Sequence, residues 1–283
     1  MTIYINGKYV QKEKAKISVF DRGLLYGDGL FESIRTYGGK PLMLDEHLDR
    51  LYEAAKTIYL QIGISKKALA QAVLKTIKIN RFKESYIKVM VTRGVSRTHG
   101  LDIKNVKGKP TIIIIVDELK ECPPTVYSKG WKAIITSIKR EDTLANIKSL
   151  NYINNIEAKI EANKRKANEA FMLTADGYLS EGTTSNLFFV KGKTLYTPSL
   201  RTGILEGLTR GVVIKSAKKL KIKVVEGFFK KEKLYKADEC FVTSSGPGII
   251  PIVKVDGRKI GRGKPGVMTI ILMAAYKDEK TSL

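Results

Sequence analysis

The sequence is poor in the residues on which several common site chemistries depend. Its two cysteines, Cys122 and Cys240, stand far apart without a second cysteine or histidine at metal-ligand spacing, so we expect neither a disulfide framework nor a metal site. The two histidines, His47 and His99, make a His-rich zinc centre or a Ser-His-Asp hydrolase hard to assemble. The chemistry must therefore rest on other side chains.

Long apolar runs and leader segments are also missing. No stretch approaches the roughly 18 to 20 apolar residues that span a bilayer, and the opening MTIYINGKYV lacks the parts of a signal peptide. We therefore expect a cytoplasmic protein with no membrane partner. No Walker A sequence occurs, and YGDGLFE lacks the third glycine and the following helix of a dinucleotide-binding fingerprint.

The charge is strongly unbalanced. Fifty-one Lys and Arg against 28 Asp and Glu give a net charge of +23, which makes a nucleic-acid-binding protein the non-enzyme alternative. The lysines are scattered over predicted helix faces, as in KKALAQAVLKTIK, and no nucleic-acid motif accompanies them. This pattern favours a solvated, lysine-rich surface and no nucleic-acid partner.

The order of predicted elements indicates an α+β fold in two domains. TIYINGKYV predicts a hairpin because Asn6-Gly7 lies between alternating apolar residues. Strands follow at LFESIRTY, SYIKVMVTRG and TIIIIVDE, and helices at DEHLDRLYEAAKTIYL and SKKALAQAVLKTIK. The run ELKECPPTVYSKG loses this periodicity at a Pro-Pro pair. It predicts a linker over residues 119–130, between a small domain at 1–118 and a larger one at 131–283.

The larger domain is predicted to mix strands with three helices. The strands are WKAIITSIKR, EAFMLTADGYLSEG with a turn at Asp176-Gly177, NLFFVKG, KTLYTPS and DECFVTSSG. The helices are expected at about 152–166, at about 207–220 and near the C-terminus.

This half of the chain offers the groups that pyridoxal phosphate (PLP) chemistry requires. Lys148, in ANIKSLNY, supplies an amine for an imine, and Glu181, in a polar turn before NLFFV, supplies a carboxylate for a pyridine nitrogen. Gly203 and Gly207 precede a helix whose first amides, with the Thr209 hydroxyl, are suited to bind a phosphate. Taken singly, these residues also fit a surface lysine, a turn glutamate and turn glycines.

Six segments together resemble the fold type IV PLP enzymes, a family of branched-chain aminotransferases, D-amino-acid transaminases and aminodeoxychorismate lyases. The segments are DRGLLYGDGLFESIR, EHLDRL, IKSLNY, YLSEGTTSNLF, GILEGLTR and ADECFVTSSG, in the family's order. The resemblance runs from Ile3 to the last helix. It implies a small N-terminal α/β sandwich domain and a larger C-terminal pseudo-barrel domain, with cofactor and substrate between them. It also implies a homodimer or a higher homo-oligomer.

The resemblance further implies how the cofactor is held. Lys148 is expected to form the Schiff base and to move the substrate's Cα proton, and Glu181 is expected to pair with the pyridine nitrogen. Tyr152 resembles the tyrosine that donates to the ring phenolate. The residues expected to hold the phosphate are Arg50, Leu208, Thr209, Ser244 and Ser245.

The candidate substrate-binding residues resemble more than one branch of this family. FESIR resembles the transaminases rather than the lyases. Tyr26, Phe31 and Tyr86 resemble the aromatic wall of branched-chain aminotransferases, and Gly246 is a further candidate contact. Three cationic candidates add to these: Lys88, where those enzymes often carry arginine, and Arg97 and His99, whose R-x-H arrangement resembles the carboxylate trap of D-amino-acid transaminases.

We therefore predict PLP-dependent transamination of leucine, isoleucine and valine with 2-oxoglutarate, by a ping-pong mechanism. The expected partners are small amino acids and 2-oxo acids. D-amino-acid transamination is the alternative, and aminodeoxychorismate lyase activity is a further one, because site contacts rather than the fold decide between them.

Overall fold

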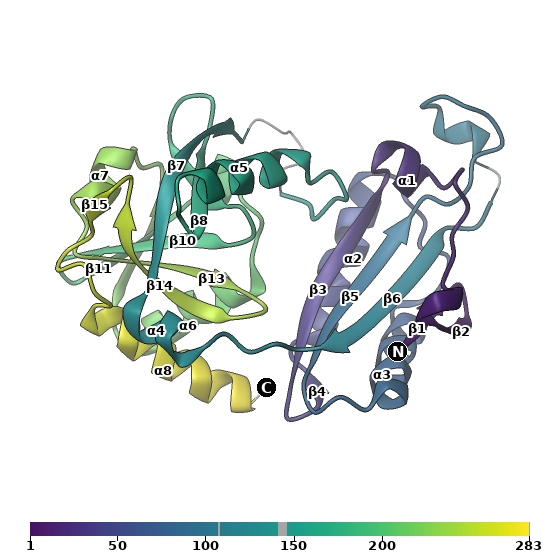
Figure 1. The fold of residues 1–283 in the computed structure, drawn as a ribbon, viewed down its shortest axis with the longest axis horizontal. Helices are drawn as coiled ribbons and strands as arrows, with labels where there is room; N and C mark the ends of the chain where they lie inside the picture. The colour runs from purple at the N-terminus through teal and green to yellow at the C-terminus, as the bar shows by residue number, and fades with distance from the viewer. Residues whose placement is uncertain (107, 141–145, 283) are drawn as a thin grey trace. The chain divides into compact units, whose positions relative to one another are not determined.

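The structure is a computed structural model that describes residues 1–106, 108–140 and 146–282, with the last three given by their backbone only. The chain forms two compact units (Figure 1). Unit 1 comprises Met1–Lys120 and Ile147–Asn151, and unit 2 comprises Glu121–Asn146 and Tyr152–Leu283. The short segment Ile147–Asn151 thus belongs to unit 1, although the chain has already entered unit 2.

Unit 1 is built on a six-stranded antiparallel sheet in the order β2-β1-β6-β5-β3-β4. Its strands are β1 (Thr2–Ile5), β2 (Lys8–Gln11), β3 (Gly29–Tyr37), β4 (Lys40–Pro41), β5 (Ser85–Thr92) and β6 (Thr111–Glu118). Its helices are α1 (Arg22–Tyr26), α2 (Leu44–Thr57) and α3 (Lys66–Asn80), with short 3-10 turns at Lys12–Lys14 and Ile103–Asn105.

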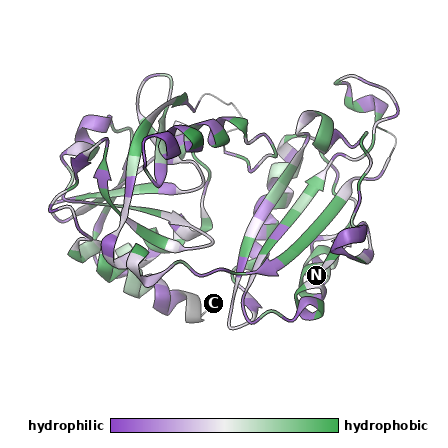
Figure 2. Ribbon diagram, in the orientation of Figure 1, coloured by the Kyte–Doolittle hydropathy of each residue, from purple (hydrophilic) through white to green (hydrophobic). Residues whose placement is uncertain are grey.

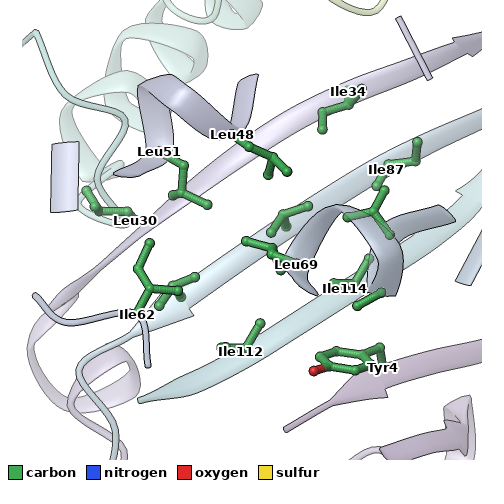
Figure 3. Packing of buried hydrophobic residues seen from close by; sticks show 14 of the residues in the cluster. Tyr4, Leu30, Ile34, Leu48, Leu51, Ile62, Leu69, Ile87, Ile112 and Ile114 are labelled. Atoms are coloured by element: carbon green, nitrogen blue, oxygen red, sulfur yellow. The ribbon is translucent and has the colours of Figure 1, made fainter. Parts of the chain in front are cut away.

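The predicted hairpin at Asn6-Gly7 is present. Both residues have positive φ angles, 48° and 91°, as the tight turn between β1 and β2 requires, and Ile5 pairs with Lys8. Helices α2 and α3 lie over one face of the sheet, where apolar side chains from alternate strand positions meet them. Figure 3 shows this core, in which Leu48, Leu69 and Ile114 are fully buried.

Unit 2 is built on a larger sheet in the order β12-β11-β10-β13-β14-β7-β8-β9, with β15 added beside β14. Its strands are β7 (Trp131–Lys139), β8 (Glu169–Leu173), β9 (Leu179–Gly182), β10 (Asn186–Lys191), β11 (Thr194–Pro198), β12 (Lys223–Gly227), β13 (Glu239–Ser244), β14 (Gly248–Val255) and β15 (Arg258–Lys259). Its helices are α4 (Pro124–Lys129), α5 (Ile153–Lys164), α6 (Leu208–Lys219), α7 (Lys231–Tyr235) and α8 (Val267–Ser282), with a 3-10 turn at Leu200–Thr202.

The sheet of unit 2 curls into a partial barrel. Strand β9 pairs with β8 at one end of the order and also lies against β10 and β11 near the other end. Strands β8, β9 and β10 are buried along nearly their whole length, because the barrel interior covers one face and neighbouring elements cover the other. This two-sided burial explains the continuous apolar runs AFML in β8 and LFFV in β10, whereas β9 carries the buried polar residues Ser180 and Glu181. Figure 2 shows apolar strands in both units.

Three details differ from the sequence-based expectations. Glu181 lies within strand β9, not in a turn, and the turn falls after it at residues 183–185. Strand β14 was not expected, because Pro251 in its middle lacks the N–H that a strand normally uses. Within the predicted linker, Pro124–Lys129 form helix α4, which packs on β14. Among the described residues, no helix is long and apolar enough to cross a membrane.

Candidate active site

Lys148 is held by its backbone along the first residues of β3. The Phe31 N–H donates to the Lys148 carbonyl at 2.9 Å, and the Leu150 N–H donates to the Gly29 carbonyl at 2.9 Å. A side chain at Gly29 would place its Cβ 2.7 Å from the Leu150 side chain and 2.7 Å from the Val91 carbonyl oxygen, so this approach requires glycine. The lysine segment is therefore fixed within unit 1.

Two amines lie over the Phe31 ring. The Lys148 Nζ is 4.5 Å and the Lys88 Nζ 4.7 Å from the ring centroid, which is within the range of cation–π attraction. Burial lowers the pKa of Lys88, and the positive charge of Lys148 lowers it further. Tyr86 shares this sheet face by strand alternation, and its hydroxyl donates to Ser33 Oγ at 2.9 Å. The structure thus brings four of the predicted residues, Phe31, Tyr86, Lys88 and Lys148, to one side of β3.

Arg50 lies on the opposite, helix-covered side of β3. Its Nε and Nη2 donate to the two carboxylate oxygens of Glu32 at 2.8 and 2.7 Å, and His47 Nδ1 is 2.7 Å from the same carboxylate. Glu32 is only 1% exposed. Burial alone would raise its pKa, but the hydrogen bonds and charges of His47 and Arg50 outweigh this and bring the pKa to about 2.

The R-x-H pair lies in an exposed loop of unit 1. Arg97 and His99 are both exposed, and the His99 ring lies 6.4 Å from the Phe20 ring between centroids. The Tyr26 hydroxyl accepts a hydrogen bond from the Gly100 N–H at 3.2 Å. Tyr26 therefore contacts the loop that carries the R-x-H pair.

In unit 2, the Glu181 carboxylate is buried and its orientation is fixed. One oxygen lies 3.1 Å from Arg140 Nη2, and the other accepts from the Leu205 N–H at 3.0 Å and from Asn186 Nδ2 at 3.2 Å. Arg140 is held in turn by a hydrogen bond from its Nε to the Gly203 carbonyl. A carboxylate anchored in this way keeps a defined direction, as pairing with a pyridine nitrogen requires.

Asn186 connects Glu181 to the start of α6. Its Nδ2 also donates to the Leu205 carbonyl at 2.9 Å. A Cβ on Gly207, the residue before the helix, would lie 2.0 Å from Asn186 Oδ1, so glycine is required there. Gly207 caps α6 without a side-chain hydrogen bond, and Thr209 in the first turn is buried. The beginning of this helix has the polarity that attracts an anion.

The remaining candidates of unit 2 lie at element ends. Ser244 closes strand β13, and Ser245 and Gly246 form the half-buried turn to β14. Just before them, the buried Thr243 Oγ1 has no hydrogen-bond partner among the described residues. Tyr152 immediately precedes α5.

Glu169 organises the turn that follows Glu181. It is 2% exposed and accepts hydrogen bonds from the Thr183 N–H, Thr183 Oγ1 and Ser185 Oγ at 2.7 to 3.0 Å. The Thr183 carbonyl accepts from Asn155 Nδ2 on α5 at 2.7 Å. The backbone from β9 to β10 is therefore held by a buried polar network.

Several of these polar residues were not predicted as site residues from the sequence. Arg140 ends a predicted strand, but nothing distinguishes it among 51 basic residues. Asn186 and Glu169 lie within segments predicted as strands, but their amide and carboxylate carry no spacing signal of their own. Among the described residues, no group of three or more His, Cys, Asp or Glu is arranged to hold a metal ion.

Solved structures of branched-chain amino acid aminotransferases are similar to this chain. A structure of the branched-chain amino acid aminotransferase from Escherichia coli superposes with a TM-score of 0.90 at 31% identity, over 99% of this chain and 94% of that one. The branched-chain amino acid aminotransferase of T.th. with pyridoxamine 5'-phosphate gives 0.92 at 30% identity, over 99% and 94%. The predicted fold class, a two-domain fold type IV enzyme, is confirmed.

The family model of amino-transferase class IV matches residues 29–255, and the chain belongs to this family. The chain is 45% identical to the "Putative branched-chain-amino-acid aminotransferase" of Methanocaldococcus jannaschii, over 99% of this chain and 97% of that one. It is 35% identical to the aminodeoxychorismate lyase of Bacillus subtilis (98% and 94%) and 33% identical to the D-alanine aminotransferase of Staphylococcus haemolyticus (97% and 96%). The predictions of an aminotransferase and of PLP as its cofactor are confirmed.

The Glu32 cluster leads to a pH prediction. Because the folded pKa of Glu32 is about 2 against 4.5 for an ordinary glutamate, its charge stabilises the fold above pH 4.5 and loses this effect as the pH falls towards 2. The full contribution is roughly 3 kcal/mol, and more than half of it is lost by about pH 3. The free energy of unfolding measured in urea should therefore be lower for Glu32→Gln than for wild type at neutral pH. The difference between the two proteins should decrease as the pH falls. A difference in unfolding free energy that does not change with pH would contradict the pairing of Glu32 with His47 and Arg50.

Proposed function

We propose that this protein transfers the amino group of leucine, isoleucine or valine to 2-oxoglutarate, in two half-reactions of a ping-pong mechanism. Lys148 is the lysine that binds PLP. A cytoplasmic location stays a prediction.

The residues present fit PLP. Glu181 offers a carboxylate whose direction is set by Arg140, Asn186 and the Leu205 amide. Helix α6 begins at a glycine cap with no side-chain hydrogen bond, and the Thr243 hydroxyl is buried without a partner among the described residues. An anchored carboxylate, an uncapped helix start and an available hydroxyl match a pyridine nitrogen and a phosphate.

The chain's own residues would then divide the work. Bound PLP supplies an electron sink for the charge that develops at the substrate Cα. Lys148 would hold the cofactor through Nζ, and its amine would move the Cα proton of the substrate. Glu181 would keep the pyridine nitrogen protonated, and Tyr152 would donate to the ring phenolate. The phosphate would be held by Arg50, Leu208, Thr209, Ser244 and Ser245.

The observation that carries the substrate proposal is the Phe31 ring beside Lys148. A reacting amino acid must bring its Cα close to the Lys148 Nζ, and this amine lies 4.5 Å from the ring centroid. Phe31 and Tyr86 on the same sheet face favour an aliphatic side chain, because burial against aromatic carbon is favourable. The similarity to the Methanocaldococcus jannaschii protein over nearly the whole chain supports the same substrates.

D-amino-acid transamination is the second candidate function. The exposed Arg97 and His99 favour it, because a cationic pair that binds the substrate carboxylate would reverse the side of the amino acid presented to Lys148. The similarity to D-alanine aminotransferases supports it as well.

Covalent labelling tests the role of Lys148. Borohydride reduction of the PLP-loaded protein, followed by peptide mass spectrometry, should find the cofactor on Lys148. In Lys148→Ala that label should be lost and turnover should fall by at least ~100-fold, because the amine also moves the proton. Lys88→Ala is the matched control, since it removes the other amine over Phe31 and should keep the label on Lys148. A label that survives Lys148→Ala with turnover intact would overturn the assignment.

Two amino acids separate the candidate functions. We expect L-leucine, and not D-alanine, to convert the bound cofactor to its amine form, seen as loss of the visible absorption band. Conversion by D-alanine alone would shift the assignment to the second candidate. An absorption band that neither amino acid changes would contradict both candidates and favour a lyase reaction like that of the Bacillus subtilis relative.

We also propose that the protein works as a homodimer or a higher homo-oligomer. The mass measured by light scattering should then be at least about twice the 31.6 kDa of one chain. A mass of one chain in the active sample would rule this out.

A further inference from the structure

A single carboxylate oxygen in unit 1 joins two arginines. Asp28 Oδ2 accepts hydrogen bonds from Arg22 Nε at 2.7 Å and from Arg93 Nε at 2.8 Å. All three side chains are largely buried, with 15%, 3% and 11% of their surface exposed. Asp28 belongs to the YGDG sequence, whose glycine spacing suggested a nucleotide site without matching one.

The outer nitrogens of Arg22 hold the far end of the R-x-H loop, residues 94–101. Arg22 Nη1 donates to the Gly100 carbonyl at 2.9 Å, and Nη2 donates to the Leu101 carbonyl at 3.1 Å. The Tyr26 hydroxyl accepts from the Gly100 N–H. Arg93 donates hydrogen bonds to the end of α2 instead, from Nη1 to the Tyr59 carbonyl and from Nη2 to the Ile58 carbonyl.

The near end of the loop is fixed by the same part of the chain. The Arg22 N–H donates to the Gly94 carbonyl at 2.9 Å, and Asp21 forms a bridge with Val95. Gly94 has a φ of 88°, and a Cβ there would lie 2.2 Å from the Lys109 carbonyl oxygen, so only glycine fits. The loop is thus tied down at both ends, with Arg97 and His99 exposed between the ties.

The charge on Asp28 keeps the two arginines together. Burial alone would raise the pKa of this carboxyl, but the hydrogen bonds and charges of Arg93 and Arg22 outweigh it and lower the pKa below its usual range. Without the carboxylate, two guanidinium groups would face each other in a largely buried place, where like charges repel strongly.

We propose that Asp28 is a positioning residue for substrate recognition. By pairing with Arg22 and Arg93 it sets the R-x-H loop, so that Arg97 and His99 are held in place for a substrate carboxylate, which is that of a D-amino acid or, if L-amino acids react, the second carboxylate of 2-oxoglutarate. This inference rests on the proposed transamination and adds to it a residue that acts on substrate binding without touching the substrate. Preorganising a binding group in this way lowers the entropy lost on binding.

Amide exchange tests the link between Asp28 and the loop. Deuterium exchange followed by mass spectrometry should show amides 94–101 exchanging at least about tenfold faster in Asp28→Asn than in wild type. Arg22→Lys keeps the positive charge but lacks the fork that reaches both carbonyls, so it should show the same change if Asp28→Asn fails to fold. Asp49→Asn is the control, because Asp49 is exposed, pairs with Lys66 on α3 and contacts none of these residues. Loop exchange at the wild-type rate in both test variants would overturn the proposal.

Steady-state kinetics separate positioning from simple stability. The KM for D-alanine, or for 2-oxoglutarate if L-leucine is the reacting amino acid, should rise by about tenfold in the two test variants while kcat changes by less than about threefold. A lower melting temperature with unchanged KM would show that Asp28 only stabilises the fold, and would overturn the inference. A wild-type protein that reacts with neither amino acid would instead overturn the proposed function and, with it, the substrate half of this inference. The exchange rates would still decide whether Asp28 holds the loop.

Discussion

A carboxylate taken out of water must be met by hydrogen-bond donors or cations, and both units are arranged around this requirement. Asp28 and Glu32 in unit 1 and Glu181 in unit 2 each receive donors from segments distant in the sequence. Leaving such a group unmet costs several kcal/mol, which is comparable with the whole stability of a domain. These pairings therefore hold the backbone around them in one arrangement, and candidate site residues close to them in the sequence are positioned by that backbone.

The carboxylates are satisfied in different ways, and the difference matters for the site. Glu32 and Asp28 are matched by cations, whereas the partners of Glu169 are neutral hydroxyl and amide groups of Thr183 and Ser185. Glu169 therefore shapes the turn after β9, and the negative charge of Glu181 is paired with Arg140. Close approach adds a second constraint, because a Cβ on Gly182 would lie 2.3 Å from Ser185 Oγ. Charge pairing and tight packing together leave the Glu181 carboxylate little freedom.

The sequence was most informative where a local pattern decides the structure. The Asn6-Gly7 hairpin and the helices α2 and α3 follow from turn chemistry and from apolar periodicity. Strand β14 was not predicted because proline, here Pro251, normally disfavours a strand inside a sheet. Pairing with β13 and β7 on either side outweighs this preference. Arg140 and Asp28 were not predicted for a different reason. They contact residues that only the fold brings near, and residue spacing in the sequence does not indicate such contacts. The candidate cofactor residues came from the family resemblance, not from local patterns.

The comparisons explain why the fold alone leaves the substrate open. Relatives named for branched-chain transamination, for D-alanine transamination and for lyase activity each align with at least 97% of this chain, at 45%, 33% and 35% identity. A scaffold shared by three activities must place its distinguishing chemistry in a few side chains. In unit 1 the candidates for this role occupy two places: the sheet face with Phe31 and Lys88, and the R-x-H loop. The first is built on rigid strands, whereas the second depends on the Arg22–Asp28–Arg93 pairing for its shape. Under the proposed role of the R-x-H loop, a change in specificity needs no change in the sheet, because altering the loop or the residues that hold it changes what would face the substrate carboxylate.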